Sequence, residues 1–255
     1  MTITLIGAGN VGGHLGRALH QAGHRIAQVF SRTPNRAAAL AQDCGAEAIH
    51  QLQSLQPGSE LYLLAVRDDA IGEVAAKTAP QLPPEAILAH TSGATPATVL
   101  APHWPNYGVF YPLQSLSEGQ PADFAEIPLC IFGANPDSQQ RLHGLAESLS
   151  HLVYRVDDEQ RARLHLAAVF INNFINAMLQ ASHELTRGAQ LPPQILAPLL
   201  RATIDKGTRQ EPRSVQTGPA IRGDQQTLER HLQQLSNHPE LSVVYKAVTA
   251  YIQTF

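Results

Sequence analysis

The sequence predicts an α/β protein in which an N-terminal doubly wound parallel sheet is followed by an all-helical C-terminal domain. Three observations lead to this fold class. A short apolar strand runs directly into a glycine loop and a helix at the start of the chain. Apolar strand-like runs then alternate with helical segments through residues 1–156, which is typical of a parallel sheet with helices on both faces. Residues 157–255 carry helical patterns only.

The first strand, near residues 3–6, leads through the glycine loop into a helix predicted over 11–22. Gly7, Gly9 and Gly12 match G-x-G-x-x-G in the strand-to-helix context that this motif requires. In a Rossmann-type sheet, such glycines allow a tight turn, the close approach of a pyrophosphate and close helix packing. We therefore predict a dinucleotide site that comprises Gly7, Gly9, Asn10, Val11 and Gly12. The alternative is a tight turn without a ligand.

The remaining elements of the predicted sheet domain follow from apolar periodicity. Strands are expected at 25–30, 61–66, 86–90, 107–111, 128–132 and 152–156. Helices are expected between them at 35–43, 71–79, 97–100 and 136–150.

Beyond residue 156 the pattern changes. Three acidic residues at 157–159 favour a helix N-terminus, and no proline or glycine interrupts the chain before residue 188. One long helix is therefore predicted over 157–187, with further helices at 193–206, 224–235 and 239–253. We assign residues 1–156 to a dinucleotide-binding domain and residues 157–255 to a helical substrate and dimerisation domain.

Charge and composition exclude several classes of protein. The net charge of −3 provides no basic surface for nucleic acid or an anionic membrane. No apolar run approaches the ~20 residues of a membrane span, and the early first strand leaves no room for a signal peptide. The histidines are scattered, so no metal site is expected. Cys44 and Cys130 lie far apart in apolar segments, which favours a reducing cytoplasm.

The end of the second strand indicates the cofactor. Proteins that bind NAD usually carry Asp or Glu there, where it holds the ribose 2′-hydroxyl. This chain has Ser31 and Arg32 instead, with Arg36 one turn later. A guanidinium can bind the 2′-phosphate of NADP, so NADP(H) is predicted and NAD is the alternative. Arg32 could equally be a solvated loop residue.

Two later strand ends should line the same crevice, because ligands bind at the carboxyl ends of parallel strands. One carries Ala65, Val66 and Asp68, of which Asp68 could instead cap the next helix. The other carries His90, Thr91 and Ser92, which could hydrogen-bond the cofactor near the nicotinamide. A helix-capping role for Thr91 or Ser92 is the alternative.

The long helix carries polar residues within an apolar sequence, and buried polar groups cost free energy unless they are satisfied. They could face a substrate cleft or join helices in a dimer, and a buried, satisfied structural histidine is the remaining alternative. These residues are His165, Asn172, Asn173, Asn176, Gln180 and His183. We predict that His165 and Asn173 face the cleft. In the irregular segment 207–223, Arg222 could bind a substrate carboxylate or phosphate, whereas Asp224 is expected to cap the next helix.

Several motifs together resemble one family, the Rossmann-like proteins whose C-terminal half is known as domain of unknown function 2520. They are residues 7–12, 65–69, 90–93 and 112–115, the spacing of His165, Val169, Phe170 and Asn173, and residues 217–224. The resemblance covers the whole chain. It implies an NADP-dependent oxidoreductase, more distantly similar to pyrroline-5-carboxylate reductase, the β-hydroxyacid dehydrogenases and the NADP-reducing deazaflavin oxidoreductases. It also implies substrate contacts at Tyr111, where relatives often carry His, and at Gln114.

The hydroxyacid enzymes use a Lys and an Asn on the corresponding long helix. The lysines of this chain, Lys77, Lys206 and Lys246, all lie elsewhere. His165 is therefore the expected acid–base group, with Asn173 orienting the substrate. The predicted reaction transfers hydride between NADP(H) and a small polar substrate: an imine, an oxo acid or a hydroxy acid. The alternative is a dinucleotide-binding sensor or partner module without turnover. A homodimer through the helical domain is expected in either case.

Overall fold

The computed structural model describes residues 1–255, which divide into two compact units, Met1–Asn172 and Asn173–Phe255. The domain boundary predicted between residues 156 and 157 precedes this division. The segment between the two positions, residues 157–172, belongs to the first unit.

The first unit contains one eight-stranded sheet in the order β3-β2-β1-β4-β5-β6-β7-β8. Its strands are β1 (Thr2–Ile6), β2 (Arg25–Phe30), β3 (Glu47–Ile49), β4 (Leu61–Leu64), β5 (Ile87–His90), β6 (Tyr107–Pro112), β7 (Leu129–Gly133) and β8 (Val153–Arg155). The strand order reverses between β1 and β4, which lie side by side and parallel. Ligands of doubly wound sheets bind at this reversal, outside the carboxyl ends of the strands.

One strand departs from the predicted parallel sheet: β7 pairs antiparallel with β6, whereas the other neighbouring strands run parallel. A parallel return needs a crossover, which is usually a helix. The connection between β6 and β7 contains only the short 3-10 turn Phe124–Glu126, and the chain returns antiparallel. The sequence also gave no indication of β3, which is only three residues long.

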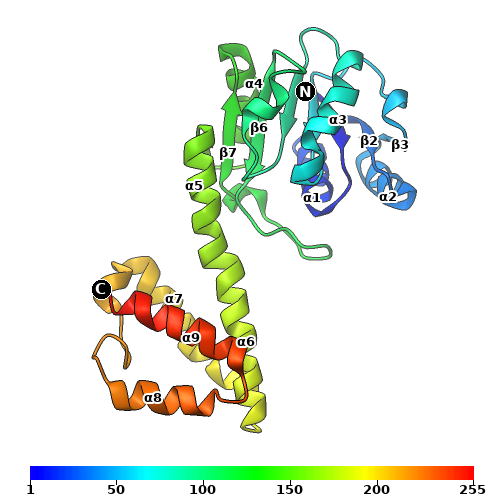
Figure 1. Ribbon diagram of the computed structural model, residues 1–255. Helices are drawn as coiled ribbons and strands as arrows, with labels where there is room; N and C mark the ends of the chain where they lie inside the picture. Colours follow the sequence, from blue (N-terminus) through cyan, green and yellow to red (C-terminus); the bar gives the residue numbers. More distant parts are fainter. The chain divides into compact units, whose positions relative to one another are not determined.

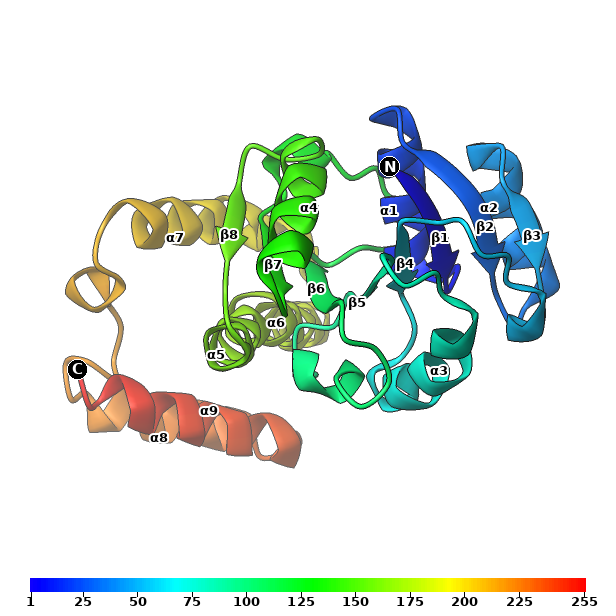
Figure 2. The same ribbon diagram turned by 90° about the horizontal axis from the view of Figure 1, so that it is seen from above.

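Helices cover both faces of the sheet. They are α1 (Asn10–Gln21), α2 (Pro34–Cys44), α3 (Ile71–Thr78) and α4 (Pro136–Glu147), each close to its predicted range. Figure 2 shows α1, α2 and α4 on one face and α3 on the other. The α/β fold class predicted from the sequence is confirmed.

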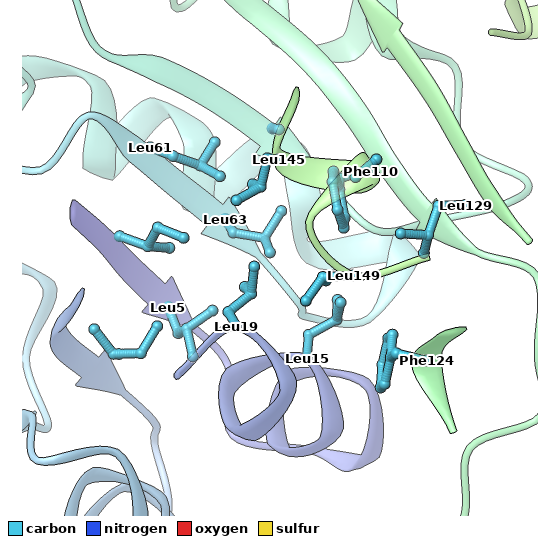
Figure 3. Close-up of a cluster of buried hydrophobic side chains, with 14 of the residues drawn as sticks. Leu5, Leu15, Leu19, Leu61, Leu63, Phe110, Phe124, Leu129, Leu145 and Leu149 are labelled. Atoms are coloured by element: carbon cyan, nitrogen blue, oxygen red, sulfur yellow. The ribbon is translucent and has the colours of Figure 1, made fainter. Parts of the chain in front are cut away.

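Each face has its own apolar core. On one face, Leu15 and Leu19 of α1 point towards Leu5 and Leu63 of the sheet, all of them fully buried (Figure 3). On the other face, Ile71 of α3 belongs to a second cluster. These cores pack against both faces of β1, β4 and β5, whose carboxyl-end loops carry the predicted site.

A long helix follows the sheet, as the sequence predicted (Figure 1). It consists of α5 (Asp158–Val169), a π-helical turn (Phe170–Phe174) and α6 (Ile175–Gly188). Asp157 caps its start by accepting a hydrogen bond from the Gln160 N–H. By length and composition alone, Asp158–Gly188 could cross a membrane, with a mean hydropathy of 1.2 in its most apolar window. The sequence analysis expected no apolar run of about 20 residues, whereas this helix meets the test by length and composition. One such helix is weak evidence for a membrane span.

The second unit continues with a 3-10 turn (Pro193–Leu196), α7 (Ala197–Arg209), a second 3-10 turn (Pro212–Val215), α8 (Gln225–Gln234) and α9 (Pro239–Ile252). Asp224 caps α8 by accepting a hydrogen bond from the Thr227 N–H, as predicted. Only three apolar side chains of this unit are buried: Ala220, Leu228 and Leu235. Many large apolar side chains on α6, α7 and α9 are exposed, among them Leu199 at 66% and Val243 at 68%.

Candidate functional site

The glycine loop between β1 and α1 is shaped by close backbone contacts. Gly7 has a φ of +120°, and a Cβ added there would lie 2.2 Å from the Ala65 carbonyl oxygen. A Cβ on Gly12 would lie 2.0 Å from the Gly7 oxygen, so the first turn of α1 packs directly on the loop. A Cβ on Gly9 would meet nothing within 4 Å. The loop is thus closed towards the protein at Gly7 and Gly12 and open to a ligand at Gly9.

A cavity of about 520 Å³ extends from this loop towards β2. Gly7, Gly9, Ser31, Arg32, Arg36, Ala65, Val66 and Arg67 are among the residues that line it. Arg32 is exposed and forms no salt bridge, which leaves its guanidinium available to an anion. Ser31 is buried, and its hydroxyl accepts a hydrogen bond from the Thr33 N–H at 3.1 Å, so it shapes the turn.

A second cavity, of about 640 Å³, also includes Gly9 in its lining. It brings together residues from the ends of β1, β4 and β5 with a histidine of α5: Gly9, Asn10, Val11, Ala65, Val66, Asp68, Thr91, Ser92, Gly93 and His165 are among its lining residues. All of these except Gly93 are predicted site residues. The capping alternative for Asp68 finds no support, because the 3-10 turn that it begins has no side-chain cap.

The turn after β5 is held by its own hydrogen bonds. Ser92 Oγ accepts from the Ala94 and Thr95 N–H groups at 3.1 and 2.9 Å and donates to Thr95 Oγ1 at 3.0 Å. The Thr91 hydroxyl donates to the Leu64 carbonyl oxygen at 3.4 Å. Thr91 and Ser92 therefore line the cavity and also hold the turn. The predicted capping alternative is wrong, because the next helical turn, Ala97–Leu100, follows Pro96 and has no side-chain cap.

His90 requires a correction. We predicted a cofactor contact, but its side chain is fully buried and lines neither cavity, because it ends β5 on an inward-facing position. Its Nδ1 accepts the Ser92 N–H at 3.2 Å, so it supports the turn from within. Burial, reinforced by the charge of Arg161, lowers the pKa of His90 to about 4. The imidazole is therefore neutral at physiological pH.

His165 of α5 meets Tyr111 of β6 at the edge of the second cavity. Tyr111 Oη and His165 Nδ1 are 3.2 Å apart, and the two rings pack edge-on. Burial raises the pKa of Tyr111 to about 12, so the phenol keeps its proton. Both side chains press against Gly93, where a Cβ would lie 2.6 Å from Tyr111 Cζ and 2.7 Å from His165 Nδ1. A side chain at position 93 would therefore require the Tyr111 or His165 ring to shift.

Three residues predicted to contact the substrate do not line either cavity: Gln114, Asn173 and Arg222. Gln114 is exposed, bonds the N–H of the adjacent Ser115, and lines a separate hollow with Asp123 and Glu126. It follows β6 on a loop that leaves the sheet, which explains its displacement from the site. Asn173 and Arg222 belong to the second unit, and their roles stay predictions.

The sequence analysis missed two charged residues of the second cavity. Arg67 lines it and is paired with Asp69 at 2.6 Å. Glu118, from the loop after β6, also lines it and approaches Arg36 at 3.8 Å. The position of Arg67 directly after a predicted strand was an available signal. Nothing in the sequence placed Glu118 near Arg36, because the two residues lie far apart in the chain and meet only in the folded structure.

The comparisons with known proteins agree with this geometry. Residues 2–92 match the family described as NADP oxidoreductase coenzyme F420-dependent, and residues 127–252 match the domain of unknown function DUF2520. A candidate NADP oxidoreductase from Bacteroides fragilis is 39% identical, covering 100% of this chain and 98% of that one, with a TM-score of 0.93. The chain belongs to the DUF2520 family of Rossmann-like oxidoreductases. The resemblance inferred from its motifs is confirmed.

More distant structures share the fold of this DUF2520 protein. An imine reductase from Myxococcus stipitatus, solved in complex with NADP⁺, is 18% identical with a TM-score of 0.66, covering 100% of this chain and 92% of that one. A pyrroline-5-carboxylate reductase from Coxiella burnetii is 15% identical with a TM-score of 0.59, covering 99% and 97%. No curated protein matches the chain. The family match also confirms NADP as the predicted cofactor.

Proposed function

We propose that this protein is an NADPH-dependent reductase that acts on the C=N or C=O bond of a small polar substrate. The observation that carries the proposal is the position of His165. An ionisable side chain from outside the sheet lines the same cavity as Gly9, Thr91 and Ser92, at the carboxyl ends of the central strands. A pocket that only bound a dinucleotide would not require an acid–base group there.

The residues of the first cavity fit NADP. Gly9 leaves open space at the N-terminus of α1, where helix N–H groups and the helix dipole favour a pyrophosphate. Arg32 would hold the 2′-phosphate, and Glu73, a carboxylate of the same cavity, is paired with Lys77. Asn10, Val11, Val66, Thr91 and Ser92 would surround the nicotinamide half. When bound, NADPH supplies the hydride that the substrate carbon accepts.

His165 would supply the matching proton. Its Nδ1 faces the Tyr111 hydroxyl, which leaves Nε2 for the substrate. In the protonated state, Nδ1–H donates to the Tyr111 oxygen and Nε2–H donates to the substrate nitrogen or oxygen. The proton moves to that atom, the imidazolium becomes imidazole, and solvent restores the proton. Tyr111 would thus fix the orientation of the ring.

We further propose that the protein is a cytoplasmic homodimer. The support for the dimer is the apolar surface of α6, α7 and α9, which the second unit does not bury within itself. A second copy would bury it by two-fold symmetry. The support for the cytoplasm is that Cys44 and Cys130 are both free thiols.

Replacement of His165 tests the proposal. In His165→Ala, NADPH affinity should stay within about twofold of wild type, while turnover of the best substrate should fall roughly 10²- to 10⁴-fold. NADPH oxidation would be followed against a panel of imines, 2-oxo acids and 3-oxo acids. His143→Ala is the matched control, because this histidine is exposed on α4 and paired with Glu147. Full activity of His165→Ala would refute the proton-donor role.

A further inference from the structure

Helix α5 is tied to the turn after β5 by one charged pair. Asp158 Oδ1 accepts from the Ala97 N–H at 2.8 Å, and Arg161 Nη2 donates to the Thr95 carbonyl oxygen at 2.6 Å. Arg161 Nη2 also donates to Asp158 Oδ1 at 2.7 Å, so the two side chains brace each other. The first turn of the helix is therefore fastened at two points to residues 95–97.

The same face of the helix carries His165 one turn further on, since residues four apart are neighbours on a helix. His165 meets Gly93, while Arg161 meets Thr95. The helix and the turn therefore run past each other in opposite directions. Because Ser92 bonds residues 94 and 95 internally, residues 92–95 form one hydrogen-bonded piece. Fixing Thr95 against the helix thus fixes Gly93 and Ser92 relative to His165.

Burying Arg161 costs free energy that packing alone does not explain. Its side chain is only 1% exposed, and its Nε and Nη1 have no hydrogen-bond partner. Unsatisfied buried donors cost free energy, and apolar replacements of buried ionic groups are often neutral or stabilising. The contrast is Arg163, two residues along, whose side chain is 80% exposed and paired with Glu159. The buried guanidinium therefore calls for a role other than stability.

We propose that Arg161 is a positioning residue, which sets the separation between His165 and the Thr91–Gly93 wall of the cavity. The proposal rests on the proposed proton transfer by His165. A helix displaced by about 1 Å could lower the rate as much as 10²-fold, because proton transfer requires the donor within hydrogen-bond reach of the substrate. Arg161 itself lines neither cavity, so it is not expected to touch cofactor or substrate.

The test compares Arg161→Met with Arg163→Met. In Arg161→Met, kcat should fall about 10- to 100-fold, with KM for NADPH and the melting temperature close to wild type. Arg163→Met should match wild type in all three. Arg161→Lys, which keeps one donor for Thr95, should recover part of the lost kcat, and it replaces the Met variant if that variant does not fold. A wild-type kcat in Arg161→Met would overturn the proposal.

Two measurements need no substrate. The Ala97 amide should exchange its hydrogen faster in Arg161→Met, because its acceptor Asp158 loses its brace, and the imidazole NMR signals of His165 should shift. Arg163→Met should change neither. Unchanged exchange and unchanged His165 signals in Arg161→Met would refute the positioning role. His165→Ala could be fully active while Arg161→Met still changes the Ala97 exchange and the His165 signals. In that case the proposed proton transfer fails and the structural coupling between Arg161 and His165 stands.

Discussion

At the scale of single residues, Arg32 is the side chain that we expect to select the cofactor. It stands at the end of β2, lines the first cavity and has no salt-bridge partner. Wild-type protein should bind NADPH at least tenfold more tightly than NADH, a difference of about 1.4 kcal/mol. Arg32→Ala should lose most of this preference while its affinity for NADH stays nearly unchanged.

Fluorescence titration with both cofactors measures this preference. Arg25→Ala is the matched control, because Arg25 is an exposed arginine at the opposite end of the same strand. An equal affinity of the wild-type protein for NADPH and NADH would contradict the role given to Arg32.

His90 should make the protein sensitive to acid. Its pKa is lowered from 6.5 to about 4 in the folded state, so the unfolded chain binds the proton more readily. The stabilisation is complete above pH 6.5 and is lost as the pH falls towards 4. Between pH 7.5 and 5 the loss should amount to about 2 kcal/mol of unfolding free energy.

His90→Asn removes this titration but keeps an acceptor for the Ser92 N–H. Urea unfolding at both pH values would compare the two proteins. The wild type should lose about 2 kcal/mol more than the variant over this interval. The same loss in both proteins would show that His90 is not responsible.

At the scale of elements, the glycine loop offers two substitutions with opposite expected effects. Gly12→Ala places a Cβ 2.0 Å from the Gly7 oxygen, so it should destabilise the first unit by roughly 1–3 kcal/mol or more. Gly9 has an ordinary extended conformation, with φ −80° and ψ −169°, and open space at its Cβ position. Gly9→Ala should therefore fold normally but bind NADPH more weakly.

Thermal melting and NADPH titration of both variants separate the two effects. Wild-type affinity in Gly9→Ala would mean that the pyrophosphate does not approach the loop at this residue. Wild-type stability in Gly12→Ala would mean that α1 can move away from the loop without cost.

At the scale of the whole molecule, the uncovered apolar side chains of the second unit predict self-association. Sedimentation at micromolar concentration should show a dimer. Val243→Glu, on α9, should weaken it because a charge replaces a side chain that is 68% exposed in the single chain. Tyr154→Glu, at an exposed aromatic residue of β8 in the first unit, is the control. A stable wild-type monomer would refute the homodimer.

The sequence by itself determined the α/β fold class, the glycine loop, the cofactor and the long helix. These features depend on local signals: apolar periodicity, glycine spacing, the residue that ends β2, and the absence of helix breakers over 157–187. Periodicity predicts whether a segment is a helix or a strand, because the residues of that segment alone decide which of its faces is apolar.

Only the tertiary structure decided the contacts between distant segments. It reversed β7, buried His90, moved Gln114 away from the cavity and joined Tyr111 to His165 across 54 positions of the chain. It also buried Arg161, which the sequence shows only as one more charge in the first turns of a helix. The physical reason is that burial and partnership of a polar side chain depend on which elements pack around it, and no local pattern encodes that packing.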